Sequence, residues 1–175
     1  MKVYQTDKIR NLSLIGHSGS GKTTLTEAIL FATGATKRQG SVDDGNTLSD
    51  FDKEEIARKV SIGTAAIPVE FGDTKFNFLD TPGYFDFAGE MYGALEASEG
   101  AILLIDASSG VEVGTEKSWK YTETHNIPKL IFLNKMDKEN VNFEKVLNNI
   151  RDHFGDKVVP FTLPIGEAEN FKGLV

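Results

Sequence analysis

The sequence contains no cysteine, no long apolar run and no excess of basic charge. The absence of cysteine excludes disulfide bonds and thiolate metal sites, and it is typical of a protein from the cytoplasm. No apolar run approaches the roughly 20 residues that a membrane-spanning helix needs. Residues 1–8 are polar, unlike the apolar core of a signal peptide. We therefore expect a cytoplasmic protein without a membrane partner.

Acidic residues outnumber basic ones, 26 to 19, which gives a formal net charge of −7. A chain with this charge does not attract the phosphate backbone of nucleic acids, so we expect no direct nucleic-acid binding from this segment alone. Its 175 residues, 39% of them apolar, suit a single domain with a sizeable core. Internal repeats and low-complexity tracts are absent from the sequence.

Short apolar segments alternate with helical patterns along the chain. The pattern predicts strands at residues 12–15, 65–71, 75–79, 101–105, 130–133 and 158–163. It predicts helices at residues 23–33, 87–97, 113–126 and 143–154. This alternation is typical of a doubly wound α/β sheet, mostly parallel, with helices on both faces. The turn at Gly72-Asp73 predicts one antiparallel hairpin.

Residues 35–59 form a polar, charged stretch that shows no such pattern. A loop of this length inside a compact domain is usually functional or mobile. Both descriptions fit a segment that becomes ordered only when a ligand binds.

The segment Gly-His-Ser-Gly-Ser-Gly-Lys-Thr at residues 16–23 matches the phosphate-binding pattern G-x-x-x-x-G-K-[ST]. Its glycines let backbone N–H groups approach an anion, and the positive end of the following helix points to the same place. Lys22 can reach the β- and γ-phosphates of a nucleotide, and the Thr23 hydroxyl can bind Mg²⁺. A dinucleotide fingerprint is excluded, because no third glycine follows at the required spacing. The expected nucleotide-binding residues of this loop are Gly16, His17, Ser18, Gly19, Ser20, Gly21, Lys22, Thr23 and Thr24.

A second motif, Asp80-Thr81-Pro82-Gly83, follows the predicted strand at residues 75–79. Ligands of doubly wound sheets bind beyond the carboxyl ends of the strands, so Asp80 is placed to hold a Mg²⁺-bound water. The N–H of Gly83 is placed to meet a γ-phosphate, and a contact that is made and lost with this phosphate is the basis of a nucleotide switch. Taken alone, the same four residues also fit an ordinary turn.

A third motif, Asn134-Lys135-Met136-Asp137, follows the predicted strand at residues 130–133. Asp137 can accept hydrogen bonds from the N1–H and N2 amine of guanine, a pair of donors that adenine lacks. Asn134 can fix the loop, and the stem of Lys135 can cover the purine face. With the other two motifs, this one predicts a site for GTP or GDP that discriminates strongly against other bases.

The three motifs together resemble the GTP-binding domain of the translational GTPases, and most closely that of the elongation factor G family. The resemblance spans essentially the whole chain and includes residues 11–17, 80–87, 134–137 and 163–166. It implies a P-loop NTPase fold and Mg²⁺-dependent GTP hydrolysis that is stimulated by the ribosome and coupled to a step of polypeptide elongation. The string at residues 58–62 resembles the first switch of the family, where a Mg²⁺-binding threonine corresponds to Ser61. The expected metal ligands are Thr23, Ser61 and Asp80.

Two positions depart from the family pattern. The histidine that positions the attacking water in the family is replaced by Tyr84, whose hydroxyl can orient a water but does not titrate near neutral pH. We expect Tyr84 and Lys22 to serve the hydrolytic step, and we interpret His17 as a structural residue of the phosphate loop. The usual phosphate-loop aspartate falls on Gly19. With these departures, the chain resembles a divergent bacterial paralogue within the family.

Family members continue beyond the matched region, into a loop that binds guanine O6 and into further domains. We therefore expect residues 1–175 to be an incomplete GTP-binding domain of a larger multidomain protein, with weakened nucleotide affinity. Two alternatives stay open. Because of Tyr84 the domain can be a GTP-binding switch with little hydrolysis, or it can belong to a ribosomal-protection or release-factor GTPase, since these share this domain.

Overall fold

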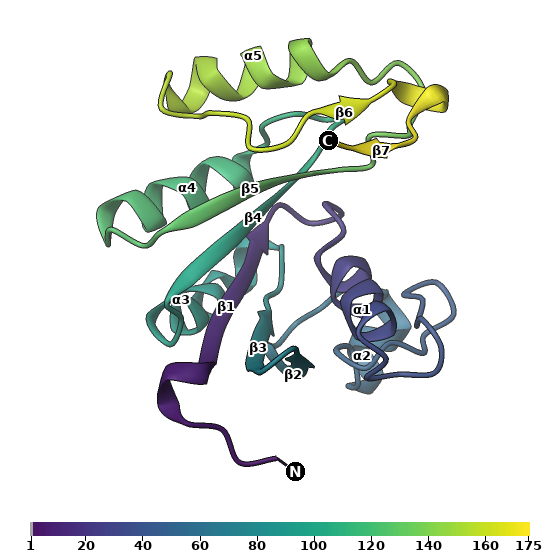
Figure 1. Ribbon diagram of the computed structural model, residues 1–175, viewed down its shortest axis with the longest axis vertical. Coiled ribbons are helices and arrows are strands. Elements are labelled where there is room, and N and C mark those ends of the chain that lie inside the picture. The colour runs from purple at the N-terminus through teal and green to yellow at the C-terminus, as the bar shows by residue number, and fades with distance from the viewer. Residues whose placement is uncertain (1) are drawn as a thin grey trace.

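The computed structural model describes residues 2–175 and shows a five-stranded sheet with helices on both faces (Figure 1). The strands of this sheet are β1 (Ile9–Gly16), β2 (Ala65–Phe71), β3 (Thr74–Asp80), β4 (Gly100–Asp106) and β5 (Lys129–Asn134). The α-helices are α1 (Lys22–Ala32), α2 (Lys53–Arg58), α3 (Ala88–Glu96), α4 (Val113–Thr124) and α5 (Phe143–Phe154). The short 3₁₀ helices are η1 (Thr6–Lys8), η2 (Phe85–Phe87) and η3 (Ala168–Asn170). Strands β6 (Pro164–Ile165) and β7 (Gly173–Leu174) pair in a small separate hairpin.

The strand order in the large sheet is β2-β3-β1-β4-β5. β1 runs parallel to β3 and β4, and β4 runs parallel to β5. β2 is antiparallel to β3 and joins it through the predicted hairpin turn. The structure therefore confirms a mostly parallel, doubly wound α/β fold with one antiparallel pair.

The central strands separate two apolar cores. Successive side chains of a strand point to opposite faces, so Leu14 and Leu104 lie under α1, whereas Ile15 and Leu103 lie on the other face with α3, α4 and α5. All four side chains are fully buried. Figure 1 shows the same separation, with α1 on one side of the sheet and α3 and α4 on the other. Burial on both faces fixes β1 and β4, and with them the loops at their carboxyl ends.

Helix α2 lies inside residues 35–59, where the sequence analysis expected no regular structure. It begins with a capping box. The Asp52 side chain accepts a hydrogen bond from a backbone N–H of the first turn, and the Glu55 side chain accepts one from the backbone N–H of Asp52. These bonds satisfy backbone N–H groups that a helix start leaves unpaired. The expectation of a patternless loop was wrong for this part of the segment.

Glu27 attaches the preceding part of this segment to α1. Its buried carboxylate accepts hydrogen bonds from the backbone N–H groups of Gly40 (3.0 Å) and Leu48 (2.6 Å). A side chain at position 40 would collide with this carboxylate. The segment is therefore held against α1 by one ionisable side chain and a glycine that lets the chain approach it.

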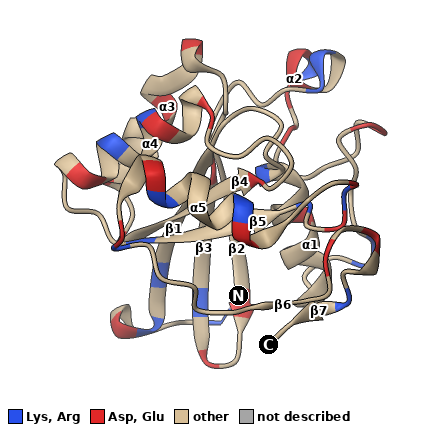
Figure 2. Ribbon diagram, turned by 90° about the horizontal axis from the view of Figure 1, so that it is seen from above, with Lys and Arg blue, Asp and Glu red and all other residues tan. Residues whose placement is uncertain are grey.

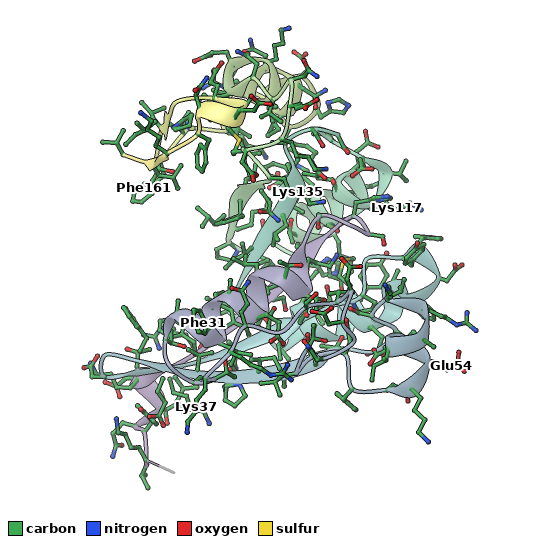
Figure 3. The ribbon with its side chains drawn as sticks, turned by 90° about the vertical axis from the view of Figure 1, so that its right-hand side faces the viewer. Phe31, Lys37, Glu54, Lys117, Lys135 and Phe161 are labelled. Carbon is green, nitrogen blue, oxygen red and sulfur yellow. The ribbon has the colours of Figure 1, made fainter. Side chains whose placement is uncertain are left out.

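The strand predicted at residues 158–163 does not form, and this expectation was wrong. Pro160 has no N–H to donate to a ladder, and the side chains of Val159 and Phe161 are exposed. Figure 3 shows Phe161 pointing away from the molecule. Leu163 exchanges two backbone hydrogen bonds with Val175 at the end of the β6–β7 hairpin, and the N–H of Val158 donates to the carbonyl oxygen of Gly155 in a turn. Between this segment and β5 lies a hollow of about 570 Å³.

Among residues 2–175, no helix is long and apolar enough to cross a membrane. Acidic and basic residues are interspersed over the helices and loops (Figure 2).

Candidate functional site

The phosphate-binding motif forms a tight loop between β1 and α1. Its three glycines have φ angles of 139° at Gly16, 78° at Gly19 and 98° at Gly21, which L-residues with a side chain rarely adopt. A side chain at Gly16 would also collide with the carbonyl oxygen of Leu104 on β4. Glycine is thus required here both by the backbone conformation and by close packing.

Lys22 lies buried at the base of this loop. Its ammonium group donates hydrogen bonds to the carbonyl oxygens of Gly16 (3.1 Å) and His17 (2.9 Å). Burial lowers the pKa of Lys22 to about 8, against the opposing effect of the Asp80 and Asp50 carboxylates. A cation with so little contact with water is costly unless an anion compensates it, which favours a phosphate group at this place.

Asp80, the last residue of β3, is 2% exposed. Within residues 2–175, neither of its carboxylate oxygens makes a hydrogen bond of ordinary geometry. Burial raises the pKa of Asp80 to about 6, and the nearby Lys22, Ser49 and Thr23 oppose this rise. A buried carboxylate without a partner indicates that a cation or a bound water normally completes the site.

The Thr23 hydroxyl lies near this carboxylate, and the Ser61 hydroxyl lies next to that of Thr23. The oxygens of Thr23 Oγ1 and Ser61 Oγ are 3.2 Å apart, and Ser61 donates a hydrogen bond of 2.7 Å to Asp50 Oδ1. Among residues 2–175, no group of three or more His, Cys, Asp or Glu side chains is arranged to hold a metal by itself. Oxygen ligands that are few in number fit Mg²⁺, which keeps several waters and uses substrate phosphates as further ligands.

The chain after Ser61 is held by helices on either side. Glu55 of α2 accepts hydrogen bonds from the N–H groups of Ile62 (2.8 Å) and Gly63 (3.1 Å). Glu90 of α3 accepts one from the N–H of Thr64 (2.9 Å). The segment that carries Ser61 is therefore tied to α2 and also to α3, which follows the second motif.

The second motif reaches the phosphate loop. The Thr81 hydroxyl donates to the carbonyl oxygen of Leu14 (2.6 Å), which fixes the turn after β3 to β1. A Cβ atom at Gly83 would lie 2.5 Å from Lys22 Nζ and 2.7 Å from the backbone nitrogen of Ser18. Only glycine permits this approach, and any group between Gly83 and the loop must fit a narrow space.

Tyr84 follows this turn and is 46% exposed. It lines a hollow of about 210 Å³ whose other walls include Gly16, His17 and Lys117. The Lys117 ammonium group lies 3.1 Å from the ring centre of Phe85, and this cation–π contact holds η2 against α4.

His17 is engaged on both ring nitrogens by the start of α4. Its Nδ1 accepts a hydrogen bond from the N–H of Gly114 (3.3 Å), and its Nε2 lies 3.5 Å from Glu112 Oε1. A side chain at Gly114 would collide with the imidazole ring. These contacts favour the structural interpretation of His17 over a catalytic one.

The third motif is joined to the phosphate loop by two hydrogen bonds. The Asn134 side-chain amide donates to the Ser20 carbonyl oxygen (2.9 Å), and Lys135 Nζ donates to the Gly19 carbonyl oxygen (2.6 Å). Figure 3 shows Lys135 in the middle of the molecule, between α1 and the β6–β7 hairpin. The exposed carboxylate of Asp137 has no hydrogen-bond or ion-pair partner in the described part of the chain. It is therefore free to accept hydrogen bonds from a ligand.

The family profile described as the elongation factor Tu GTP-binding domain matches residues 7–171. The chain belongs to this family. It is similar to ribosome-releasing factor 2, mitochondrial, of Pongo abelii, with 43% identity over 168 residues that cover 96% of this chain and 22% of the relative. It is also similar to elongation factor G of Granulibacter bethesdensis, with 35% identity over 175 residues that cover 100% of this chain and 25% of the relative.

A solved structure from Thermus thermophilus matches with a TM-score of 0.90 and 39% identity, covering 96% of this chain and 25% of that one. The chain thus spans about a quarter of the length of these relatives. The match confirms the P-loop fold and the resemblance to translational GTPases of the elongation factor G family. The chain is a GTP-binding domain of that type.

In this GTP-binding domain the three motifs lie at the carboxyl ends of β1, β3 and β5. These strand ends lie on the same side of the sheet, as the sequence predicted. The structure brings Thr23 and Ser61 together and buries Asp80 beside Lys22. The ligand and catalytic roles of these residues stay predictions.

Position 19, where the family has aspartate, offers room for a side chain. A Cβ atom built on Gly19 has no neighbour within 4 Å, but the φ angle of 78° disfavours any residue other than glycine. The backbone conformation at this position therefore favours glycine over aspartate. No other side chain occupies the space beside Gly19.

Sequence reasoning missed several acidic residues that organise the domain, namely Glu27, Asp50, Glu55, Glu90 and Asp106. Asp52 and Glu55 had the spacing of a capping box, which is a readable signal. The other carboxylates form hydrogen bonds with segments that lie far away in the sequence, so no local sequence pattern predicts these contacts.

Proposed function

We propose that this GTP-binding domain binds GTP and GDP with Mg²⁺, hydrolyses GTP and serves a step of polypeptide elongation on the ribosome. The observation that carries the proposal is the unpartnered, buried Asp80 carboxylate next to the buried Lys22 ammonium, in a place where all three motifs meet. Such a pair of groups is suited to receive a metal ion together with an anion.

In this proposal Lys22 and the N–H groups of the phosphate loop neutralise the β- and γ-phosphates. Thr23 and Ser61 supply hydroxyl ligands for Mg²⁺, and Asp80 holds one of its waters. The ion adds positive charge next to the phosphates when it is bound. Phosphoryl transfer depends chiefly on positioning and electrostatic stabilisation, so the preformed contacts around Lys22 and Ser61 are the main contribution of the chain.

In this proposal the Tyr84 hydroxyl orients the attacking water. This hydroxyl can donate and accept hydrogen bonds, but it stands where the family has a histidine. His17 does not replace the missing family histidine, because both of its ring nitrogens face α4. We therefore expect slow hydrolysis by the domain, with GTP binding intact.

The partners we propose are a guanine nucleotide and the ribosome, with the cytoplasm as the location. The relatives named ribosome-releasing factor 2 favour a second candidate, a step of ribosome release. Their identity of 41–43% exceeds the 35–38% found for the relatives named elongation factor G. The mitochondrial names of these relatives would place that second candidate in the organelle.

GTP hydrolysis by the intact protein, measured with and without ribosomes, tests the proposal. Turnover that ribosomes stimulate and that Lys22→Met removes is the expected result. If GTP binds but is not hydrolysed under either condition, the domain is a GTP-binding switch. If GTP does not bind, the proposal is refuted.

A further inference from the structure

The carboxylate of Asp106 lies next to the base-reading motif, although no motif includes it. Asp106 is the last residue of β4 and is in register with Asn134 of β5. Its side chain is 8% exposed and has two lysines as partners. Oδ2 accepts hydrogen bonds from Lys135 Nζ (2.8 Å) and Lys138 Nζ (3.2 Å). Oδ1 is held by the backbone N–H (2.9 Å) and the hydroxyl (2.6 Å) of Ser108.

The environment of Asp106 favours its ionised form. Burial opposes its ionisation, but the hydrogen bonds from Lys135, Ser108 and Lys138 outweigh this effect and hold the pKa of Asp106 well below its usual range. Hydrogen bonds between charged partners are also stronger than those between neutral ones. The carboxylate is therefore ionised near neutral pH and attracts both ammonium groups.

One consequence concerns the shape of the Lys135 side chain. Lys135 has a left-handed backbone with a φ angle of 59°, and its ammonium group also bonds the carbonyl oxygen of Gly19. With Asp106 and Gly19 as fixed partners at its tip, the hydrocarbon stem of Lys135 has little freedom. Conformational freedom that is lost before binding does not oppose binding.

A second consequence concerns Asp137. Lys135 and Lys138 are the lysines nearest to it in sequence, and Asp106 bonds both. Asp137 itself is exposed, with its carboxylate free of hydrogen bonds and ion pairs to residues 2–175. Without Asp106, the two ammonium groups would be free to pair with Asp137 and to compete with the N1–H and N2 amine of guanine.

We infer that Asp106 is a positioning residue for guanine recognition, which holds Lys135 in the conformation that covers the base and keeps Lys135 and Lys138 away from Asp137. The inference rests on the proposed function, because it presupposes that Asp137 reads guanine. Asp106 itself touches no part of the base in this account.

The test compares GDP and ADP binding, by calorimetry in Mg²⁺ buffer, for the wild type and Asp106→Asn. The asparagine keeps the size of the side chain and an oxygen for Ser108 but loses the charge that attracts the lysines. We expect the preference for GDP over ADP to fall about tenfold or more, which corresponds to about 1.4 kcal/mol. Adding Lys138→Met to Asp106→Asn should restore part of the preference, because it removes one competitor for Asp137.

Glu123→Gln is the matched control. Glu123 of α4 is also a carboxylate bonded by two lysines, Lys129 and Lys157, but it lies away from the three motifs. Its loss should leave the nucleotide preference unchanged. Thermal unfolding of each variant shows whether it is folded, and Asp106→Glu, which keeps the charge but displaces it, is used if Asp106→Asn does not fold. It should reduce the preference less.

An equal loss of GDP and ADP affinity in a folded variant would overturn the inference, because a merely structural role predicts no change in preference. An unchanged preference would overturn it as well. A wild type that does not prefer GDP would instead refute the proposed function, and the two failures are thereby distinguished.

Discussion

The hydroxyl oxygens of Thr23 and Ser61, 38 positions apart in the sequence, lie 3.2 Å from each other. The contact joins the first turn of α1 to the segment after α2. Ser61 is held there by Asp50, and the following residues are held by Glu55. The segment that the proposal assigns to the first switch thus lies next to the first turn of α1, which follows the phosphate loop.

Removing the Ser61 hydroxyl should weaken the binding of Mg²⁺ with GTP. We expect Ser61→Ala to reduce GTP affinity about tenfold at limiting Mg²⁺ and to leave GDP affinity within about twofold, because the switch ligand is needed mainly when a γ-phosphate is present. Titration calorimetry over a Mg²⁺ series measures this, with Ser61→Thr as the variant that retains a hydroxyl. Equal losses for GTP and GDP would exclude Ser61 as a switch ligand.

Nucleotide affinity should depend on pH through two buried groups. Asp80, with a pKa raised to about 6 by burial, must be ionised to act on Mg²⁺, and Lys22, with a pKa lowered to about 8 by burial, must be protonated to bind phosphate. Affinity for GTP with Mg²⁺ should therefore be highest between about pH 6 and 8 and fall on both sides.

The acidic limb of this profile belongs to Asp80, so Asp80→Asn should lack it.

The same group also affects the stability of the fold. The folded state binds the Asp80 proton more tightly than the unfolded state, whose pKa is near 3.8, so this group contributes stability at low pH that is lost as the pH rises through about 6. A pH profile of GTP binding that is flat from about 5 to about 9 would contradict the assignment.

Replacing Lys22 removes the cation of the phosphate loop. Lys22→Met keeps the volume of the side chain, and we expect more than about a hundredfold loss of GDP and GTP affinity, since hydrogen bonds to a charged group contribute about 1.5–3 kcal/mol each. Lys120→Met on the exposed face of α4 is the control and should bind as the wild type does. Unchanged GDP affinity in Lys22→Met would show that the loop does not bind phosphate.

Tyr84 variants separate a working GTPase from a binding switch. If the Tyr84 hydroxyl orients the attacking water, Tyr84→Phe should lower ribosome-stimulated turnover about tenfold or more without changing GTP affinity, and Tyr84→His should raise it. Single-turnover hydrolysis of labelled GTP measures both. Turnover that occurs only in Tyr84→His would identify the natural domain as chiefly a GTP-binding switch.

The sequence predicted the parts of the fold that rest on local pattern. The strands around Leu14 and Leu104 are apolar on both faces, and the phosphate loop has glycines that only a tight turn requires. The strand predicted at residues 158–163 does not form although the segment is apolar, because Pro160 lacks the N–H that pairing needs. Helix α2 was missed because it is short and polar, so no apolar periodicity marks it.

The site was predictable only as far as its motifs extend. Lys22, Asp80 and Asp137 were found because each belongs to a pattern with a fixed spacing. The contacts of Glu27 with Gly40 and of Asp106 with Lys138 depend on how separate segments pack, and no spacing along the chain encodes them. Such carboxylates are identified only once the fold places their partners.

Competition binding shows whether the domain recognises guanine or binds any purine nucleotide. The wild type and Asp137→Asn are titrated with GTP, ATP and XTP against a fluorescent GDP analogue in Mg²⁺ buffer. We expect GTP to compete at least about a hundredfold better than ATP with the wild type. We expect Asp137→Asn to weaken GTP and to favour XTP, whose 2-oxo group pairs with the new amide. A wild type that binds ATP as tightly as GTP, or an Asp137→Asn variant with unchanged preference, would contradict it.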